Sequence, residues 1–311
     1  MSYAQRTFTA VSYNCENLFD IRHDSLKQDG EFLPDGERHW TFSRYYKKLN
    51  DIGRTILQCG GEGEEWALPD VVGLTEVEND SVMTALTRMS MLRGAHYNYV
   101  MTNSADVRGV DVALMYNPFR FKLFHSEEII IPTKPQQRPT RNILYASMST
   151  AHKDTLHIFV VHAPSRSGGQ YLTEDYRLFV VEKLLGKVDS IRAISATPKI
   201  LLMGDFNDYS YNKSIKRIVD YGLQEASLNA VGKNHPQEVL GTYCFQHQWE
   251  SLDHIFVSQA ITATQCYIYD ADWLLETDAA GNMKPRRTFL GPHYHGGVSD
   301  HLPLVLHFSI P

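Results

Sequence analysis

Asp205 and Asn207 stand two residues apart, directly after the apolar run Ile200-Leu-Leu-Met203 and Gly204. A short apolar run bounded by turn residues is typical of a buried strand. If the backbone stays extended, the two polar side chains point the same way. A carboxylate and an amide at the end of such a strand could position a metal-bound water and a phosphate oxygen together. Asp and Asn also favour turns for local hydrogen-bonding reasons, so this stretch alone supports an Asx-rich turn equally well.

Other apolar stretches of the chain also end on polar residues. Loops at strand ends commonly carry function, because the scaffold holds them in place. Single residues of this kind have structural explanations: Glu76 could cap the following helix, and His162 could be satisfied within its turn. Acids, amides and histidines at successive strand ends nevertheless indicate one shared site. They are Asn14 and Glu16, Glu76, His162, Asp205 and Asn207, Asp253, and Asp300 and His301.

The residue types indicate the chemistry of such a site. Oxygen ligands without thiolates suit a hard cation such as Mg²⁺ or Mn²⁺, which keeps most of its waters and meets substrate phosphate. Histidines beside it can donate to phosphoryl oxygens or shuttle protons near neutral pH. An acid next to a histidine fixes its tautomer and supports its charged form. The set favours metal-assisted hydrolysis of a phosphate ester.

Strands and helices must position these residues. Alternating or continuous apolar runs predict strands, apolar residues at helical spacing predict helices, and Asn79 or Asp80 can cap one helix. Polar segments at 22–40, 132–139 and 273–292 are predicted to be loops or irregular. The predicted strands cover residues 7–14, 70–76, 97–101, 110–116, 119–131, 142–150, 156–161, 200–203, 242–245, 251–258 and 301–309. The predicted helices cover residues 42–58, 81–91, 171–194 and 212–221.

The composition is that of a large globular chain. Its 311 residues suggest one large domain or two ordinary ones, and 43% of them are hydrophobic, enough to bury a core. No linker or fixed-period repeat divides the chain, so residues 1–311 are predicted to form a single domain. The net charge of −6 argues against a protein that holds nucleic acid by bulk electrostatics, but leaves a local basic groove open.

The cysteine spacing and the hydropathy argue against a zinc-ribbon, disulfide-rich or membrane-spanning protein. Cys15, Cys59, Cys244 and Cys266 are widely spaced and form no CxxC pair, so we expect buried or free thiols rather than a zinc ribbon or a disulfide framework. No apolar stretch approaches the length of a membrane span, and the first residues do not resemble a signal peptide. We therefore expect a soluble protein, either cytoplasmic or exported after removal of a leader.

Six short motifs carry the polar residues along the chain. They are Tyr13-Asn-Cys-Glu16, Leu74-Thr-Glu76, Val161-His-Ala-Pro164, Gly204-Asp-Phe-Asn207, Ser251-Leu-Asp-His254 and Ser299-Asp-His-Leu-Pro303. In this order they resemble the endonuclease/exonuclease/phosphatase superfamily, whose fold is deoxyribonuclease I-like, and the resemblance runs from Asn14 to His301. It implies an α/β (α+β) fold: a four-layer α/β/β/α sandwich of two packed mixed β-sheets flanked by helices, with a metal site at one edge.

The resemblance implies a cation site, with Mg²⁺ or Mn²⁺ as the cofactor. Glu76 resembles the main metal ligand of the family. Asn14 and Glu16 resemble the amide and the acid that line the site, although Glu16 stands where many relatives carry Asp or Gly. Asp300 resembles the residue on the metal side.

The same resemblance implies catalytic roles. Asp205 resembles the residue that orients or deprotonates the attacking water. Asn207 and His162 resemble donors to the scissile phosphate and would therefore also bind substrate. His301 resembles the histidine that contacts a non-bridging oxygen, with Asp253 as its orienting acid. The identity of the general base and the number of metals stay open.

Three further residues have competing interpretations. Asp111 could supply a carboxylate to His162 and so help to bind substrate, or it could belong to a surface charge run. Arg166 and Arg177 could bind phosphate. Arg177 lies in a helical pattern, where a salt bridge explains it at least as well.

Two residue pairs occur near the C-terminal end. His293 and His295 invite a zinc interpretation, but they have no third ligand nearby in a Gly- and Pro-containing loop, which favours solvated side chains. Arg286 and Arg287 could touch a nucleic-acid backbone, and an exposed charge pair is the plainer interpretation.

The sequence therefore predicts a metal-dependent phosphoester hydrolase. The first hypothesis is an endonuclease or phosphodiesterase that cleaves nucleic-acid phosphodiester bonds by in-line attack of an activated water. The second keeps the mechanism but uses a small substrate, namely a phospholipid headgroup, an inositol phosphate or a nucleotide. The third is a non-catalytic binding protein on the same scaffold, which the full set of polar residues argues against. Fold does not decide the substrate, so we expect specificity to lie in the three irregular segments.

Overall fold

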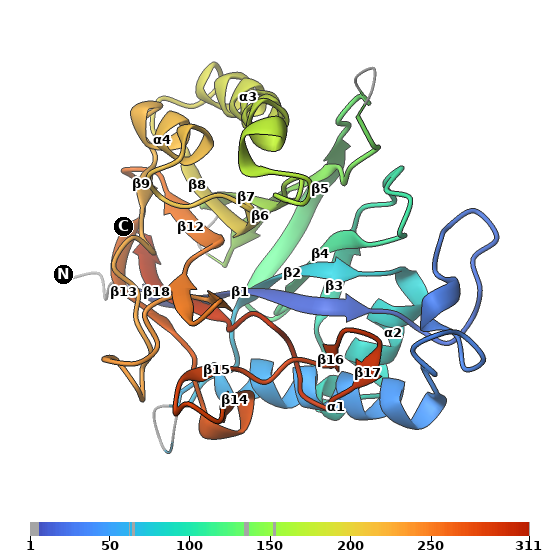
Figure 1. Cartoon of the computed structure of the whole chain (residues 1–311). Coiled ribbons are helices and arrows are strands. Elements are labelled where there is room, and N and C mark those ends of the chain that lie inside the picture. The colour runs from blue at the N-terminus through green and yellow to red at the C-terminus, as the bar shows by residue number, and fades with distance from the viewer. Residues whose placement is uncertain (1–5, 62, 64–65, 134–136, 152–153, 311) are drawn as a thin grey trace.

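Two six-stranded mixed β-sheets form the centre of the structure (Figure 1). The computed structural model describes residues 6–310 except 62, 64–65, 134–136 and 152–153. The first sheet has the order β13 (Thr262–Ile268), β18 (Leu304–Ile310), β1 (Arg6–Leu18), β2 (Val71–Val77), β4 (Asp111–Tyr116) and β3 (Asn98–Met101). The second has the order β5 (Phe121–Ile129), β6 (Ile143–Thr150), β7 (Thr155–His162), β8 (Lys199–Asp205), β12 (Asp253–Val257) and β9 (Gln224–Glu225).

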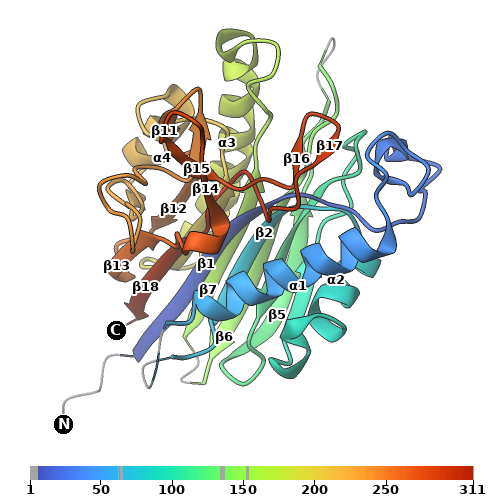
Figure 2. The same cartoon turned by 60° about the horizontal axis from the view of Figure 1, so that its bottom comes forward.

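Helices cover the outer face of each sheet. Helices α1 (Phe42–Gln58) and α2 (Asp80–Arg88) lie against the first sheet, and helices α3 (Gln170–Arg192) and α4 (Lys213–Asp220) lie against the second (Figures 1 and 2). The predicted architecture of helix, sheet, sheet and helix is therefore confirmed.

Strand β8 shows why the central strands are apolar throughout. Its side chains alternate, so Leu201 and Met203 join the core between the sheets, while Ile200 and Leu202 join the core beneath α3 and α4. A strand covered on both faces needs apolar residues at every position, which explains the continuous run in the sequence. The sheets approach closely at Gly73 of β2, where a Cβ atom would lie 2.7 Å from the sulfur of Met203.

Most of the predicted elements are present, with small shifts at their ends. The helix predicted at 42–58 is α1, and Asn79 caps α2 by accepting a hydrogen bond from the Val82 N–H at 3.0 Å. Strand β13 was not predicted. Its sequence, Thr-Ala-Thr-Gln-Cys-Tyr-Ile, has no clear alternation, because β13 is an edge strand that is largely exposed.

The segments predicted to be irregular contain short elements. Segment 22–40 holds the 3-10 helix η1 (Gly30–Phe32), and part of segment 132–139 lies outside the described residues. Segment 273–292 is more ordered than predicted, because it folds into short antiparallel pairs. The remaining short elements are η3 (Met91–Gly94), β10 (Tyr243–Phe245), β11 (Gln248–Glu250), η4 (Asp272–Leu274), β14 (Leu275–Thr277), β15 (Met283–Pro285), β16 (Phe289–Leu290) and β17 (His293–Tyr294).

Two predictions about classes of protein can be compared with the structure. Among the helices of the described residues, none combines the length and the apolar character needed to cross a membrane. All four cysteines are free thiols, as predicted, and two of them, Cys15 and Cys59, are buried.

Candidate active site

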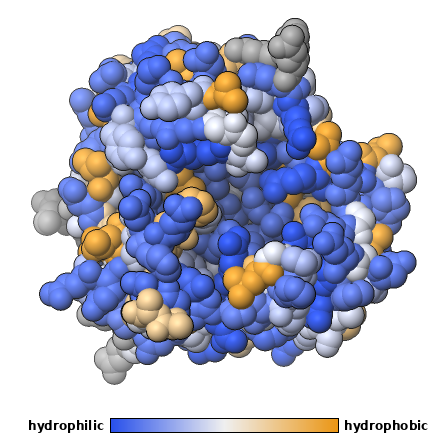
Figure 3. All heavy atoms as spheres, in the orientation of Figure 1, coloured by the Kyte–Doolittle hydropathy of each residue, from blue (hydrophilic) through white to orange (hydrophobic). Residues whose placement is uncertain are grey.

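One cavity gathers most of the predicted site residues. It has a volume of about 670 Å³. Figure 3 shows a hollow lined mainly by hydrophilic side chains near the middle of the face seen in Figure 1. The predicted residues that line the cavity are Asn14, Glu76, His162, Arg166, Asp205, Asn207, Asp300 and His301.

The register of the second sheet brings three of the polar residues side by side. Strands β7 and β8 are parallel, with His162 opposite Asp205, and β8 and β12 are antiparallel, with Asp205 opposite Asp253. Gly204 permits this close approach: its φ is 137°, and a Cβ atom there would lie 2.0 Å from the Val161 carbonyl oxygen. The close spacing between β7 and β8 at this edge therefore depends on glycine at position 204.

Asp205 is buried at the centre of the site. Its Oδ2 accepts a hydrogen bond from Asn14 Nδ2 at 3.0 Å, and its Oδ1 accepts one from the Asn207 backbone N–H at 2.8 Å. Burial, together with the charge of Asp253, raises the pKa of Asp205 to about 7. A carboxylate with that pKa can accept a proton from water near neutral pH.

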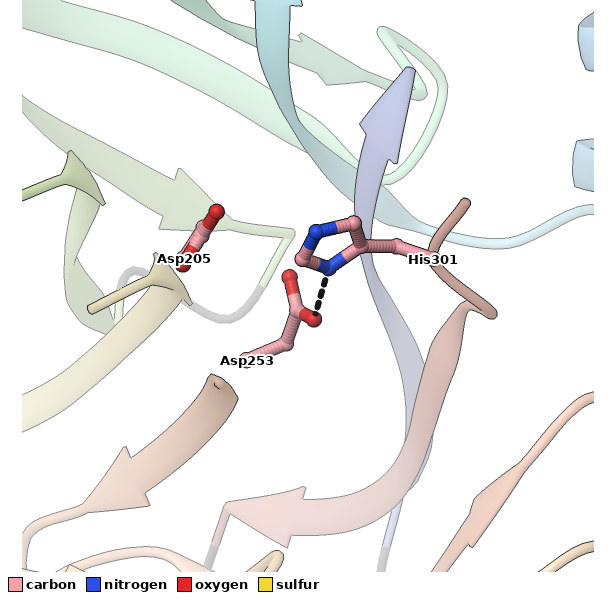
Figure 4. Close-up of side chains that lie close together, drawn as sticks. All are labelled: Asp205, Asp253 and His301. Atoms are coloured by element: carbon pink, nitrogen blue, oxygen red, sulfur yellow. Dashed lines mark hydrogen bonds and ion pairs between the residues drawn. The ribbon is translucent and has the colours of Figure 1, made fainter. Parts of the chain in front are cut away.

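His301 is held by an acid, as the resemblance implies. Its Nδ1 lies 2.7 Å from Asp253 Oδ2 (Figure 4). The same oxygen accepts a hydrogen bond from the Thr242 hydroxyl at 2.7 Å. Burial alone would lower the pKa of His301, but the Asp253 carboxylate outweighs it and raises that pKa to about 10. His301 is therefore an imidazolium at neutral pH, with its Nε2–H left to face the cavity.

His162 is also buried, but no acid bonds its Nδ1. Its Nδ1 has no hydrogen-bond partner, and its Nε2 lies 3.6 Å from Asp205 Oδ2 and 3.8 Å from Glu76 Oε1. Burial and the nearby Arg141 and Arg108 guanidinium groups hold the pKa of His162 well below its usual range. His162 is therefore a neutral imidazole.

Asp111 does not supply the predicted carboxylate to His162. It lies in β4, outside the group that lines the cavity, and its Oδ1 accepts hydrogen bonds from the Thr102 hydroxyl at 2.6 Å and the Ser104 N–H at 3.0 Å. Its carboxylate is used to close the turn between β3 and β4. Arg141 instead holds the end of β7, donating to the carbonyl of His162 at 3.2 Å.

Glu76 presents one carboxylate oxygen to the cavity. Its Oε2 accepts a hydrogen bond from the Asn17 N–H at 2.8 Å, while its Oε1 lies 3.6 Å from Arg108 Nη2. Glu76, Asn17 and Asn207 all have positive φ angles, of 60°, 56° and 51°. Left-handed backbone at residues other than glycine costs free energy and gathers at functional sites, where the surroundings hold it in place.

The donors of the cavity fit a hard divalent cation. The carboxylates of Glu76 and Asp205 and the amide of Asn14 all face it, and the charge of Glu76 adds to the rise in the Asp205 pKa. A cation between these oxygens would offset that repulsion. A second group, Asp205, Asp253 and His301, also has ligand atoms within 4.8 Å of one another, but there Asp253 already bonds His301 and Thr242. We therefore favour the Glu76 side.

Glu16 differs from its prediction. With φ of 46° it leaves the extended conformation, so the expected alternation after Asn14 fails and its carboxylate turns away from the cavity. Its Oε2 accepts a hydrogen bond from the Thr288 N–H at 2.6 Å, and its Oε1 lies 3.5 Å from Arg287 Nε. Arg287 also donates to Asp300 Oδ2 at 2.6 Å, so it is a partly exposed ion-pair partner, whereas Arg286 is exposed as predicted from the sequence.

The description "Endonuclease/Exonuclease/phosphatase family" belongs to the family model that matches the chain, over residues 9–309. The chain belongs to this family. A search of curated protein sequences gives no match. The family is generally dependent on a divalent metal, in agreement with the oxygen-rich cavity.

Several solved structures share the fold. A Bacteroides thetaiotaomicron endonuclease/exonuclease/phosphatase family protein matches with a TM-score of 0.65 and 15% identity, over 99% of this chain and 100% of that one. The human Nocturnin catalytic domain with bound sulfate has a TM-score of 0.61 and 21% identity, over 98% and 94%. D. rerio TDP2 complexed with single-strand DNA product has a TM-score of 0.59 and 16% identity, over 97% and 99%.

Of the arginines and histidines with competing interpretations, one lines the cavity and two are bonded to acids elsewhere in the fold. Arg166 lines the cavity, with its guanidinium 4.0 Å from the centre of the Tyr209 ring. Arg177 is fully buried, and its Nε lies 2.8 Å from Asp208 Oδ1, so the salt-bridge interpretation holds. His295 bonds Glu276, which accounts for it without zinc.

Sequence reasoning missed several side chains of the cavity wall. Tyr243 and Phe245 come from the short β10–β11 hairpin, and Tyr209 and Arg108 come from turns. No local pattern marks these residues as functional. For Tyr209 alone, its position two residues after Asn207 could have indicated that it lies near the site.

Proposed function

We propose that this chain is a divalent-cation-dependent phosphodiesterase that hydrolyses the backbone of a nucleic acid. One observation carries the proposal: a buried carboxylate, Asp205, stands between a neutral and a charged histidine in a cavity with a further carboxylate, Glu76. Asp205 and His162 are 3.6 Å apart, and His301 reaches the same cavity with its orienting acid behind it.

The residues of the cavity divide the work of hydrolysis. Asp205 accepts a proton from the attacking water, because it is the buried carboxylate at the centre of the cavity and burial raises its pKa above the ordinary carboxyl range. The His301 imidazolium donates a hydrogen bond to a phosphoryl oxygen and offsets the charge that develops there. Asn207 donates one amide hydrogen to the Ala163 carbonyl at 3.1 Å, which fixes its orientation and leaves the second hydrogen for the phosphate.

A divalent cation on Glu76 would supply positive charge to the phosphate and to the leaving oxygen. Glu76 keeps its Oε1 facing the cavity, because its Oε2 is held by the Asn17 N–H. Asn14 is oriented by Glu16, whose N–H donates to Asn14 Oδ1 at 2.9 Å. The chain thus prepares the oxygen donors in advance.

The wall of the cavity favours a substrate with aromatic rings. The residues Tyr209, Tyr243, Phe245 and Leu252 line it, and Phe245, in the β10–β11 hairpin, is 59% exposed. Aromatic side chains beside a phosphate site provide stacking surfaces for bases, irrespective of sequence.

A neighbouring cavity provides room for a longer strand. It has a volume of about 570 Å³ and shares Arg108, Ser165 and Ser167 with the first cavity. Arg138 lines it as well, and cationic side chains along a groove attract a phosphate backbone. Asp106 also lines this cavity, but the three arginines Arg108, Arg138 and Arg141 outnumber it, which supports a local attraction for phosphate despite the net charge of −6. The TDP2 neighbour, complexed with single-strand DNA product, is consistent with this substrate class.

A small phosphoester is the second candidate. The first cavity, at about 670 Å³, has the volume of a small-molecule site. One structural neighbour, with a TM-score of 0.64 and 16% identity over 97% of this chain and 100% of that one, is the Bacteroides thetaiotaomicron mannosyl-6-phosphatase Bt3783. Both candidates use the same residues and differ in the group beyond the phosphate.

Comparison of a diester with a monoester tests the proposal. We expect the purified protein with Mg²⁺ or Mn²⁺ to hydrolyse bis-(p-nitrophenyl) phosphate and a short single-stranded oligonucleotide faster than p-nitrophenyl phosphate. Phe245→Ala should slow only the oligonucleotide, by about tenfold for one lost stacking contact. The matched control is Phe124→Ala, an exposed phenylalanine on β5 outside both cavities. Turnover of the monoester alone would favour the small-substrate candidate.

A further inference from the structure

Arg287 links two carboxylates beside the cavity. Its Nη2 donates to Asp300 Oδ2 at 2.6 Å, and its Nε lies 3.5 Å from Glu16 Oε1. Glu16 is buried, while Asp300 lines the cavity and immediately precedes His301. The guanidinium therefore lies between two acids that come from opposite ends of the chain.

The backbone holds Arg287 in this place. The segment 286–288 pairs with residues 295–298: the Val298 N–H donates to the Arg286 carbonyl at 2.8 Å, and the Gly297 N–H donates to the Arg287 carbonyl at 3.2 Å. A Cβ atom at Gly297 would lie 2.0 Å from the Arg286 carbonyl oxygen, so this close pairing requires glycine. The loop that carries Arg287 is therefore fixed to the segment that carries Asp300.

A second cation supports the same cluster. Lys48 of α1 is buried, and its Nζ donates to the Thr288 hydroxyl at 2.6 Å and to the Glu16 carbonyl. Thr288 in turn donates its N–H to the Glu16 carboxylate at 2.6 Å. Two carboxylates and two side-chain cations thus meet here, and the cluster is neutral without any bound ion.

The Glu76 side of the cavity lacks this internal compensation. One cation, Arg108, lies 3.6 Å from Glu76 Oε1, and no second cation like Lys48 is bonded there in the described part of the chain. Asp205 has no lysine or arginine within ion-pair distance in the described part of the chain. A bound divalent cation has more unbalanced charge to offset here than beside Arg287.

We propose that the Arg287 guanidinium occupies the position that a second divalent cation would take between Glu16 and Asp300, so that this chain binds a single cation, at Glu76. The inference rests on the cation dependence of the proposed function and defines the number of ions. Arg287 is a positioning residue in this account: it holds Asp300, and through it the start of the His301 segment, without contacting the cation at Glu76. A planar guanidinium suits this bridging place better than an ammonium, because its nitrogens can address two carboxylates at once.

Counting bound Mn²⁺ by electron paramagnetic resonance tests the proposal without any activity assay. Wild type and the control Arg286→Met, the exposed neighbour of Arg287, should each bind one Mn²⁺ per chain. Arg287→Met should bind two, because it removes the guanidinium that lies between Glu16 and Asp300. Glu16→Gln in the wild-type background should leave Mn²⁺ affinity within about twofold, whereas Glu76→Gln should lower it more than tenfold, as expected when one of the few carboxylates is lost.

The contrary outcomes are distinct. Two ions on the wild type, or loss of Mn²⁺ binding in Glu16→Gln, would overturn the proposal. A single ion on a folded Arg287→Met protein, checked by circular dichroism, would overturn the blocking role of Arg287. If Arg287→Met does not fold, the wild-type count and the Glu16→Gln affinity still decide. No bound ion on the wild type would reject the cation dependence itself.

Discussion

The two walls of the cavity each present a buried histidine, and the two histidines differ in their neighbours. On the wall formed by β12 and the segment before β18, His301 Nδ1 lies 2.7 Å from Asp253. On the wall formed by the end of β7, His162 Nδ1 has no hydrogen-bond partner, its Nε2 lies 3.6 Å from Asp205 Oδ2, and the guanidinium groups of Arg141 and Arg108 are nearby. Their exposures are 6% and 3%, so burial does not distinguish them.

The comparison shows how neighbours divide one residue type into two roles. Burial lowers the pKa of both imidazoles, but the acid beside His301 raises its pKa to about 10, whereas the guanidinium groups near His162 lower its pKa further. One wall therefore offers a fixed positive charge to the phosphate, and the other offers a neutral hydrogen-bonding group. Asp205 lies between the two histidines and is the carboxylate that accepts the proton in the proposed mechanism.

Removal of the shared carboxylate should have the largest effect. Asp205→Asn keeps the size of the side chain but cannot accept the proton of water, so we expect kcat on a diester with Mg²⁺ to fall by about 10³-fold or more, within the range for loss of a general base. The control is Asp220→Asn at the exposed end of α4, which should keep wild-type turnover. Near wild-type turnover of Asp205→Asn would remove Asp205 from the mechanism.

Loss of the positive charge of His301 should have the second largest effect on kcat. His301→Gln retains a hydrogen-bond donor but loses the positive charge, so we expect kcat to fall by about 10²–10³-fold, the usual result of deleting a preorganised transition-state donor. Steady-state kinetics on the same diester measure the change. A fall of less than about threefold would contradict a role for the His301 charge.

Replacement of the neutral His162 should have a smaller effect on kcat. A glutamine amide can replace a neutral imidazole as a hydrogen-bonding group, so His162→Gln should lower kcat by about tenfold, equivalent to one ordinary hydrogen bond. Measured beside His301→Gln, this variant sharpens the comparison directly. The comparison fails if the two glutamine variants lose activity equally.

A third buried histidine extends the comparison to stability. Both ring nitrogens of His254 face acceptors, with Nδ1 2.8 Å from Glu225 and Nε2 2.8 Å from the Asp208 carbonyl, so both nitrogens must carry hydrogens. Burial opposes charge on both partners, but their contact raises the pKa of His254 and lowers that of Glu225. The raised pKa stabilises the fold fully below the ordinary histidine value of 6.5, and this contribution is lost as pH rises through the raised pKa.

The pH dependence of unfolding follows from these signs. The lowered pKa of Glu225 adds stability above its ordinary value of 4.5, which is lost as pH falls through the lowered pKa. His254→Gln should therefore lower the free energy of unfolding by about 2 kcal/mol, the value of a hydrogen bond to a charged group, between the two ordinary pKa values. Denaturant titrations should show that the difference in the free energy of unfolding between wild type and His254→Gln becomes smaller at high pH. The control is His125→Gln, because His125 forms an exposed pair with Glu127; this variant should change the free energy of unfolding little. If it lowered the free energy of unfolding as much as His254→Gln does, the stabilising role of the His254–Glu225 pair would be refuted.

The sequence predicted those features that depend on neighbouring residues. The apolar run before Asp205 predicted β8, and the motifs placed Asn14, Glu76, His162, Asn207 and His301 in one cavity. The features that it did not predict depend on distant parts of the chain. Glu16 turns away because of a left-handed backbone and a partner, Arg287, that lies 271 residues further along. No local pattern in the sequence contains that contact.

Nicking of supercoiled plasmid DNA tests the central claim most directly. With Mg²⁺, we predict that the wild type converts supercoiled plasmid to the nicked form, that a chelator stops the reaction, and that Asp205→Asn prevents it. Absence of nicking together with turnover of a phosphomonoester would contradict the nuclease assignment. Nicking that persists with chelator, or with Asp205→Asn, would contradict the assigned site.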